Sequence, residues 1–217
     1  MRVDTLKLGG LQNNCYVLDA GDGRAVVIDP GAEPERVVAH LDRRKLACAL
    51  ILVTHGHADH IGGISGLRER FPDAEIAVGK DDAPALTNPM KNGSFFIGAN
   101  IKAPKAGRLL ADGDEVALGG VKLKAIATPG HSPGGVCFFA DDIGSKPALF
   151  SGDTLFYESV GRCDIPGGDW ERLLASLRGK LLALPDDTVV FPGHGPATTI
   201  AHEKKHNPVV GEDAEKE

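Results

Sequence analysis

The sequence predicts a single α/β domain on three observations: short apolar runs alternate with helical patterns, turn-forming residues are abundant, and 42% of the residues are hydrophobic. The 28 glycines and 14 prolines indicate many short elements joined by tight turns. The apolar content is sufficient to bury a substantial core. Because the 217 residues contain no linker, composition shift or internal repeat, we expect residues 1–217 to form one domain.

The first half of the chain predicts a β-meander, followed by helices that alternate with strands. Three apolar runs separated by glycine-containing turns form the predicted meander, at residues 3–8, 15–18 and 25–28. Pro34 begins a helical pattern, and the apolar runs 47–53 and 75–78 are typical of buried strands. A second helix is expected at residues 61–71, because Pro72 cannot continue it.

The second half predicts a hairpin, three further strands and a helix. Gly119-Gly120 separates the strand-like runs 115–118 and 121–127, which is a signal for a two-residue hairpin. The other elements are expected at residues 136–140, 148–150 and 188–191 for the strands and 170–184 for the helix.

A long connection between residues 83 and 107 is polar and rich in proline and glycine, apart from an apolar island that contains Phe95 and Phe96. Loops of this length in a compact domain are more often functional than accidental. The two phenylalanines are therefore candidate substrate contacts, as a wall over the site. The simpler interpretation of the same island is a small separate core.

Charge and cysteine usage exclude several classes of protein. The formal net charge of −6 comes without a basic run, so the cationic footprint of a nucleic-acid-binding protein is missing. No apolar run approaches the ~20 residues that span a bilayer, and no secretory signal opens the chain. Three of the four cysteines lie in apolar runs, typical of buried free thiols in a reducing compartment. We expect a cytoplasmic protein without nucleic-acid or membrane partners, and its oligomeric state stays open.

One short motif carries the strongest chemical signal. Directly after the predicted strand 47–53, the chain reads Thr54-His55-Gly56-His57-Ala58-Asp59-His60. Imidazole and carboxylate are the ligands that divalent transition metals bind at neutral pH. Clustering such groups without a metal would leave them competing for protons and hydrogen-bond partners. The motif therefore predicts a metal site on a strand-to-helix loop.

Further ligand-type residues follow the ends of three later strands. These are His131 in Thr-Pro-Gly-His, Asp153 in Ser-Gly-Asp and His194 in Pro-Gly-His-Gly. Taken alone, each histidine is more often a hydrogen-bonded structural residue than a ligand. Together with the motif they make five histidines and two aspartates, which exceeds the coordination number of a single catalytic ion. Two adjacent metals explain the surplus and leave positions open for water and substrate.

The remaining candidates have weaker signals. Asp29 ends a predicted strand in Asp-Pro-Gly and either orients a ligand histidine or simply forms a turn. His40 falls in a predicted surface helix, while His202 and His206 lie in a charged C-terminal segment. We expect these three histidines to be solvated.

In order along the chain, Asp29, residues 54–60, His131, Asp153 and His194 resemble the five motifs of the metallo-β-lactamase superfamily. The resemblance implies a four-layer αββα sandwich with metals at one edge of the sheets. Asp153 stands where the zinc β-lactamases use a cysteine, so the chain looks unlike an antibiotic-degrading enzyme. The stretches 151–156 and 161–168, with Asn207-Pro208, resemble the short glyoxalase II-like (hydroxyacylglutathione hydrolase-like) branch.

That resemblance implies roles for the seven residues and a reaction. His55, His57 and His131 would hold one metal, Asp59, His60 and His194 the second, and Asp153 would bridge them. Asp59 and Asp153 are the catalytic candidates of the motif set. The implied activity is a thioesterase that hydrolyses hydroxyacyl-glutathione or a related small-molecule thioester through a metal-bridging hydroxide. The two divalent ions are expected to be zinc, iron or manganese, since the ligands suit all three.

Several alternatives stay open. The related persulfide dioxygenases use one iron, which would here be held by His55, His131 and Asp153. Another ester or a lactone is a third substrate class. The chain is expected to lack the C-terminal helical domain that contributes glutathione-binding residues in full-length glyoxalase II, so dependence on glutathione is open. Arg162 is a candidate contact for a substrate anion, with a structural salt bridge as the alternative.

Overall fold

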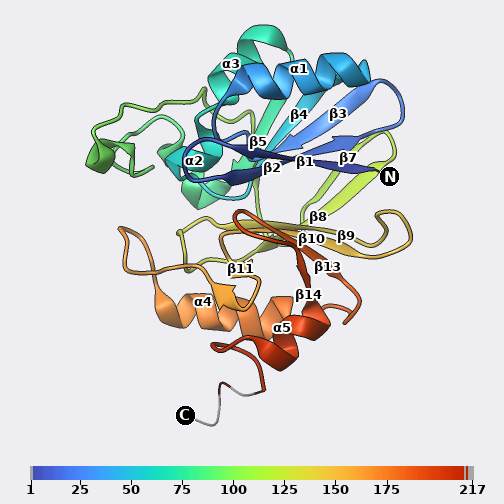
Figure 1. The fold of residues 1–217 in the computed structure, drawn as a ribbon. Coiled ribbons are helices and arrows are strands. Elements are labelled where there is room, and N and C mark those ends of the chain that lie inside the picture. Colours follow the sequence, from blue (N-terminus) through green and yellow to red (C-terminus); the bar gives the residue numbers. More distant parts are fainter. Residues whose placement is uncertain (1, 213, 215–217) are drawn as a thin grey trace.

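The computed structural model describes residues 2–212 and 214. Two six-stranded sheets lie face to face, and helices cover the outer face of each sheet (Figure 1). The four-layer αββα sandwich expected from the sequence is confirmed. The first half of the chain, blue to green, forms one helix-covered sheet, and the second half, yellow to red, forms the other (Figure 1).

The first sheet contains its strands in sequence order, from β1 to β6. Their bounds are β1 Val3–Leu8, β2 Asn13–Asp19, β3 Arg24–Ile28, β4 Ala47–Val53, β5 Glu75–Gly79 and β6 Arg108–Leu110. The first three strands pair antiparallel, which confirms the meander, whereas β3 to β6 run parallel. Helices α1 (Pro34–Arg44) and α3 (Ile64–Arg70) bury apolar residues against its outer face.

The second sheet has the order β14-β13-β10-β9-β8-β7. Its strands are β7 Glu115–Leu118, β8 Val121–Ala127, β9 Val136–Ala140, β10 Ala148–Gly152, β13 Val189–Pro192 and β14 Thr198–Thr199. Its outer face is covered by α4 (Trp170–Ser176), the π-helical turn Leu177–Leu181 and α5 (Ile200–His206). A small hairpin, β11 (Leu155–Phe156) and β12 (Ser159–Val160), lies outside both sheets.

Strand β4 shows why its sequence is apolar without interruption. Ile51 and Val53 face the helices α1 and α3, whereas Leu50 and Leu52 face the second sheet. A strand covered on both faces needs apolar side chains at every position, unlike a strand with one solvated face. The central layer between the sheets also contains the fully buried Phe138 of β9.

Two predicted helices are shorter than the sequence pattern indicated. The predicted helix at 61–71 is two helices, α2 (Ala58–Ile61) and α3, with Gly62 and Gly63 between them. A Cβ on Gly62 would lie 2.4 Å from the Gly31 carbonyl oxygen, and one on Gly63 would lie 2.7 Å from that of Pro30. Close packing against this neighbouring loop explains the glycine pair, where the apolar periodicity alone suggested continuity. The predicted helix at 170–184 ends its regular α-helical turns at Ser176.

The sequence pattern missed the shortest elements. Strands β6, β11, β12 and β14 have two or three residues each, too few to show alternation. Helix α5 was also missed, because its segment is charged and was expected to be solvated. One of its charged residues, Glu203, is in fact buried and accepts hydrogen bonds from Thr198 Oγ1 at 2.6 Å and Asn207 Nδ2 at 2.7 Å. Between residues 83 and 107, the predicted irregular connection contains only the 3-10 turns η1 (Lys80–Ala85) and η2 (Ser94–Ile97).

The predicted state of the cysteines is confirmed. All four are free, and Cys15, Cys48 and Cys137 are buried. Burial raises the pKa of the Cys137 thiol to about 11, so this thiol is protonated at neutral pH. Across residues 2–212 and 214, no helix has the length and apolar character needed to cross a membrane.

Replacing Leu52 with alanine tests the layer between the sheets. Leu52 is 0% exposed, and a cavity at such a position lowers the free energy of unfolding by about 2–5 kcal/mol. Leu109→Ala is the control, because Leu109 is 51% exposed and its truncation should change stability by less than about 0.5 kcal/mol. Urea denaturation of both variants measures the difference, and equal stabilities would contradict this account of the core.

Candidate metal centre

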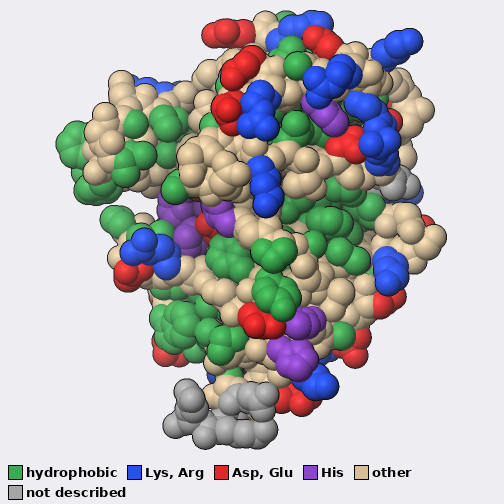
Figure 2. Space-filling view, viewed as in Figure 1, with side chains coloured by type: hydrophobic (Ala, Val, Ile, Leu, Met, Phe, Trp, Pro, Cys, Tyr) green, Lys and Arg blue, Asp and Glu red, His purple; other side chains and the backbone are tan. Residues whose placement is uncertain are grey.

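Loops at the ends of four strands converge on one edge of the sandwich. The loops follow β4, β8, β10 and β13, and each carries ligand-type side chains at the place where its strand ends. In the space-filling view, histidine side chains lie at the bottom of a hollow between the two halves of the molecule (Figure 2). The hollow lies beneath a protrusion rich in hydrophobic side chains (Figure 2).

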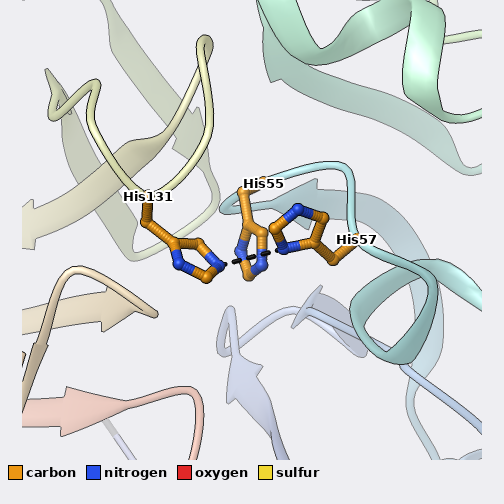
Figure 3. A group of neighbouring side chains, drawn as sticks. All are labelled: His55, His57 and His131. Atoms are coloured by element: carbon orange, nitrogen blue, oxygen red, sulfur yellow. Dashed lines mark hydrogen bonds between the residues drawn. The ribbon is translucent and has the colours of Figure 1, made fainter. Parts of the chain in front are cut away.

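His55, His57 and His131 form the first group of potential ligands. Their rings turn toward one another from two separate loops, after β4 and after β8 (Figure 3). His57 Nδ1 lies 2.9 Å from His131 Nε2, and the ligand atoms of the three residues lie within 4.8 Å of one another. The family resemblance implied that these three residues form one ligand set, and the fold brings them together.

Asp59, His60 and His194 form the second group. Asp59 and His60 are on the short helix α2, and His194 follows β13. His194 Nε2 lies 3.1 Å from Asp59 Oδ2 and 3.4 Å from His60 Nε2. Residues from two distant segments of the chain thus point their donor atoms at the same small volume.

Asp153 lies between the two groups. Its Oδ1 atom is 3.3 Å from His60 Nε2 of the second group. Its Oδ2 atom is 3.7 Å from His131 Nε2 of the first group and 3.7 Å from His194 Nε2 of the second. Gly193 allows the next loop to approach this carboxylate, because a Cβ at that position would lie 2.2 Å from Asp153 Oδ1. Asp153 is therefore in reach of ligand nitrogens of both groups, and its predicted bridging role stays a prediction.

Hydrogen bonds on the far side of the rings fix which nitrogen faces the centre. His131 Nδ1 donates to the Arg162 carbonyl at 2.8 Å, and His194 Nδ1 donates to the Leu11 carbonyl at 3.0 Å, since a carbonyl only accepts. His60 Nδ1 lies 2.9 Å from the Asp29 carboxylate. In each ring the Nε2 lone pair is left to face the centre, which is the usual arrangement of metal-binding histidines.

Asp29 orients two ligand histidines rather than only forming a turn. Its Oδ1 accepts from the Thr54 backbone N–H at 2.7 Å, and its Oδ2 accepts from Thr54 Oγ1 at 2.6 Å. With its one proton donated to Asp29, the Thr54 hydroxyl accepts from His55 Nδ1, which lies 3.1 Å away. Of the two interpretations of Asp29, the orienting role is the one that the geometry supports.

Asp82 is a supporting residue that the sequence analysis missed. It is buried in η1, after β5, and its Oδ2 accepts from the Gly56 N–H at 2.8 Å while its Oδ1 accepts from the Gly134 N–H at 2.7 Å. One carboxylate thereby joins the loop of His55 and His57 to the loop of His131. Its position after a strand end was the available signal, although a second aspartate beside it made that signal ambiguous.

Strand β2 also supports the site, which its apolar sequence did not indicate. Asn14 Nδ2 donates to the carbonyls of Pro192 at 3.0 Å and Gly195 at 2.9 Å. Tyr16 Oη donates to the Pro192 carbonyl at 2.6 Å. These bonds connect the first sheet to the loop that carries His194.

The electrostatics of the centre favour cations. Burial, together with neighbouring imidazoles, lowers the pKa of His55 well below its ordinary value and that of His57 to about 4, so both rings are neutral ligands at pH 7. Burial alone would lower the pKa of His60, but the carboxylates of Asp153, Asp29 and Asp59 raise it above its ordinary value. A negative field that attracts a proton also attracts a divalent ion.

The donor atoms fit divalent metals. His55 Nε2 is buried and has no hydrogen-bond partner among the described residues, and Asp153 Oδ1 accepts no hydrogen bond of good geometry from them. Buried polar atoms without partners are uncommon in folded proteins. Coordination to an ion accounts for both, and the set of five imidazoles and two carboxylates suits zinc, iron and manganese.

Two groups of side chains, Arg162 and the pair Phe95 and Phe96, were predicted as substrate contacts. Arg162 is paired with Asp164 through contacts of 2.7 and 2.8 Å and is exposed, so the salt bridge that was the alternative is present. Phe95 and Phe96 are 59% and 61% exposed, and the alternative of a small separate core is therefore wrong. Their role, and that of the Arg162 side chain, as substrate contacts stays a prediction.

The connection that carries the two phenylalanines is anchored to the centre through Asn92. The buried Asn92 side chain donates to the carbonyls of Ala85 and Ile101, and its backbone carbonyl accepts from the Ala58 N–H at 2.9 Å. Ala58 begins the helix that holds Asp59 and His60.

The three histidines outside the motifs make other contacts. His40 Nε2 lies 3.2 Å from Asp4, and His202 Nε2 lies 2.9 Å from Glu158. The ring of His206 packs against that of His202, with 4.8 Å between centroids. His206 is exposed as expected, whereas His40 and His202 are only partly exposed and contact carboxylates.

Comparison with protein families and curated proteins gives consistent results. A family model described as the metallo-beta-lactamase superfamily matches residues 8–194. The probable metallo-hydrolase YqgX of Bacillus subtilis is 35% identical over 209 residues, which cover 96% of this chain and 97% of that protein. The hydroxyacylglutathione hydrolase GloC of Haemophilus influenzae is 34% identical over 209 residues, with the same shares covered.

Solved structures of similar proteins share the fold over almost the whole chain. BLEG-1, described as a B3 metallo-beta-lactamase, has a TM-score of 0.91 and 39% identity, covering 96% of this chain and 99% of its own. TTHA1623 in a di-iron-bound form has a TM-score of 0.83 and 41% identity, with 95% and 99% covered. ETHE1 from Myxococcus xanthus has a TM-score of 0.78 and 30% identity, with 97% and 84% covered.

Asp29→Asn tests the orienting hydrogen bonds. The amide places an N–H group where the carboxylate accepts from Thr54 and His60, and loss of such an outer partner weakens metal affinity about 10–100-fold. Elemental analysis after dialysis against graded chelator concentrations measures the affinity. Asp22→Asn is the control, because Asp22 is exposed and, within residues 2–212 and 214, pairs only with Arg24. Equal metal retention in both variants would contradict the role assigned to Asp29.

Proposed function

The chain belongs to the metallo-beta-lactamase superfamily, and from its seven-residue centre we propose that it is a glyoxalase II-like thioesterase with two divalent metals. It is a metallo-hydrolase at the level of the superfamily. The proposal adds the reaction, hydrolysis of hydroxyacyl-glutathione or a related thioester. The similarity to GloC, a hydroxyacylglutathione hydrolase, over nearly the full length of both chains supports this substrate class.

The observation that carries the proposal is the pair of donor groups with Asp153 between them. His55, His57 and His131 converge on one point, and Asp59, His60 and His194 converge on another. The Asp153 carboxylate lies within 4 Å of ligand nitrogens of both groups. A single ion would use one group and leave the donor atoms of the other group without a role, so the arrangement supports two ions.

The chemistry suits a thioester. When bound, the two ions would act as Lewis acids toward the substrate carbonyl and lower the pKa of a water to about 7. The departing thiolate has an unperturbed pKa near ~8.5 and leaves with little protonation, so the chain needs no dedicated general acid. The absence of a general acid fits this centre, because every titratable side chain in it is a candidate metal ligand.

The two aspartates have distinct tasks in this proposal. Burial raises the pKa of the Asp59 carboxyl, but the imidazoles of His60 and His194 lower it further, so the carboxylate stays ionised. Burial likewise raises the pKa of Asp153, but the neighbouring His60 lowers it by more, so the net shift is downward. As an ionised carboxylate in the second group, Asp59 would bind the second ion with one oxygen, and its other oxygen would accept a hydrogen bond from the attacking water. Asp153, which lies near both groups, would supply a negative carboxylate to both ions.

Oxygen-dependent persulfide oxidation at one iron is the second candidate. His131 Nε2 lies 3.7 Å from Asp153 Oδ2, so these two residues and His55 can serve one ion. The candidate leaves Asp59 and His194 without a function, although they lie 3.1 Å apart at the centre. For that reason the two-metal thioesterase is preferred.

The deciding experiment combines elemental analysis with three activity assays on one purified sample. We expect about two metal ions per chain and turnover of S-lactoylglutathione. Glutathione persulfide under oxygen and a cephalosporin are the other two substrates; the similarity to BLEG-1 is the reason for including the latter. One iron per chain with oxygen consumption, or turnover of the cephalosporin alone, would overturn the proposal.

Asp59→Ala and His60→Ala test the second metal position. Each removes a donor of that group, so we expect the metal content to fall from about two ions to about one. Because loss of an outer partner already costs about 10–100-fold, loss of a direct ligand should lower kcat/KM by more than ~100-fold. His206→Ala, on the exposed side of α5, should leave both values unchanged. Thioesterase activity that survives with one ion would contradict a two-metal mechanism.

A further inference from the structure

The short turn between β1 and β2 contacts a ligand of the second metal group. Residues 9–12 form this turn. The Gln12 N–H closes it by donating to the Gly9 carbonyl at 3.2 Å. The Leu11 carbonyl takes no part in that bond and accepts from His194 Nδ1 at 3.0 Å instead. One peptide group of a surface turn therefore orients a ligand histidine.

His194 depends on this bond more than His60 depends on its own outer partner. The His194 side chain is 27% exposed, whereas that of His60 is 0% exposed. Packing restrains the His60 ring in addition to the buried Asp29 carboxylate, which lies 2.9 Å from it. A partly exposed ring is less restrained by packing, so the bond to Leu11 decides where its Nε2 atom points.

Gln12 holds the turn in a conformation that is uncommon for its residue type. Its φ of 56° lies in the left-handed region, which a residue with a Cβ adopts only at a cost. The Leu11 carbonyl belongs to the peptide group that precedes this rotation, so the φ angle of Gln12 helps to set the direction of that carbonyl. The Gln12 side chain supports the conformation, because its Nε2 donates to the Gly9 carbonyl at 3.0 Å.

Glu33 holds the other end of the turn. It occupies the N-cap position of α1 with a left-handed φ of 48°, yet its side chain makes no capping bond to the helix. Its Oε2 accepts instead from the Gly9 N–H at 2.8 Å, and Arg36 donates to the same oxygen at 2.7 Å. Two strained residues and an unused cap at one surface turn indicate a task beyond joining two strands.

We propose that Gln12 and Glu33 are positioning residues for the second metal ion, and that they act through the Leu11 carbonyl on His194. Glu33 and Gln12 both bond to Gly9, and the turn that they fix directs the Leu11 carbonyl at the ring. The inference rests on the two-metal centre of the proposed function. It adds that a surface turn sets the affinity of the second ion.

Two substitutions of Gln12 test the backbone conformation. Valine and asparagine both remove the long amide that reaches Gly9, but asparagine tolerates the left-handed region and β-branched valine does not. In Gln12→Val we expect the second ion to bind about 10-fold more weakly, the low end for loss of an outer partner, and the first ion to bind as before. Gln12→Asn should retain most of the wild-type affinity for both ions.

Elemental analysis after dialysis against graded chelator concentrations measures both affinities as two steps of metal loss. Asp59→Ala lacks a donor of the second group, so the step that it retains identifies the first ion. Thermal unfolding of each metal-free variant shows whether a change in affinity merely follows a change in stability. Equal weakening of both ions in Gln12→Val, or equal behaviour of Gln12→Val and Gln12→Asn, would contradict the role of the left-handed conformation.

A second pair of variants tests Glu33. Glu33→Ala removes the acceptor of the Gly9 N–H and should weaken the second ion, whereas Glu33→Gln keeps an oxygen there and should restore most of the affinity. Glu35→Ala is the control, because Glu35 is exposed in the first turn of the same helix. If Glu35→Ala weakened the second ion as much as Glu33→Ala, the effect would come from α1 in general and the role of Glu33 would be wrong.

The outcomes separate this inference from the proposed reaction. If folded Gln12→Val and Glu33→Ala both bound two ions with wild-type affinity, the inference would be overturned and the thioesterase proposal would stand. A selectively weakened second ion in these variants, without thioester turnover by the wild type, would remove the reaction and support the inference. A wild type that binds a single ion at every metal concentration would remove both.

Discussion

The packing of two apolar sheet faces against each other is the constraint on which the site depends. Leu52 of β4, Phe138 of β9 and Phe150 of β10 fill the layer between the sheets and are fully buried. Since this contact fixes how the sheets are placed, it also fixes where β4, β8, β10 and β13 end. The four loops that carry the ligand-type residues meet because the core holds the two sheets, and with them the ends of these strands, in fixed positions relative to each other.

Strand ends alone do not orient side chains, and a second set of contacts supplies that precision. Asp29 holds Thr54 and His60, and Asp82 joins the backbone of Gly56 to that of Gly134. Both are buried carboxylates, and both bond mostly to N–H groups of the ligand loops. The ligands thus keep their geometry before any ion arrives, which lowers the reorganisation that binding requires.

Much of this arrangement could be predicted from the sequence, and the missed features have a common cause. The motif at residues 54–60 predicted the site because imidazoles and carboxylates crowded at that spacing compete for protons unless they share a metal. The strands of the core were predictable from continuous apolar runs such as residues 47–53. By contrast, the role of Asp82 and the break at Gly62 depend on backbone that is distant in the sequence, at Gly134 and Gly31. Local patterns carry no information about such contacts, and two-residue strands such as β14 are too short to show any pattern.

The motif also explains how one short segment supplies donors to two separate groups. His57 has extended backbone, with φ −72° and ψ 151°, and helix α2 begins at the next residue. His55 and His57 both precede the helix, in the non-helical loop after β4, and their ring centroids lie 4.6 Å apart. Beyond Ala58 the helical geometry turns successive side chains about the axis, so Asp59 and His60 point to the second group. The change of backbone conformation inside the motif, rather than the number of histidines, is what divides the ligands between two positions.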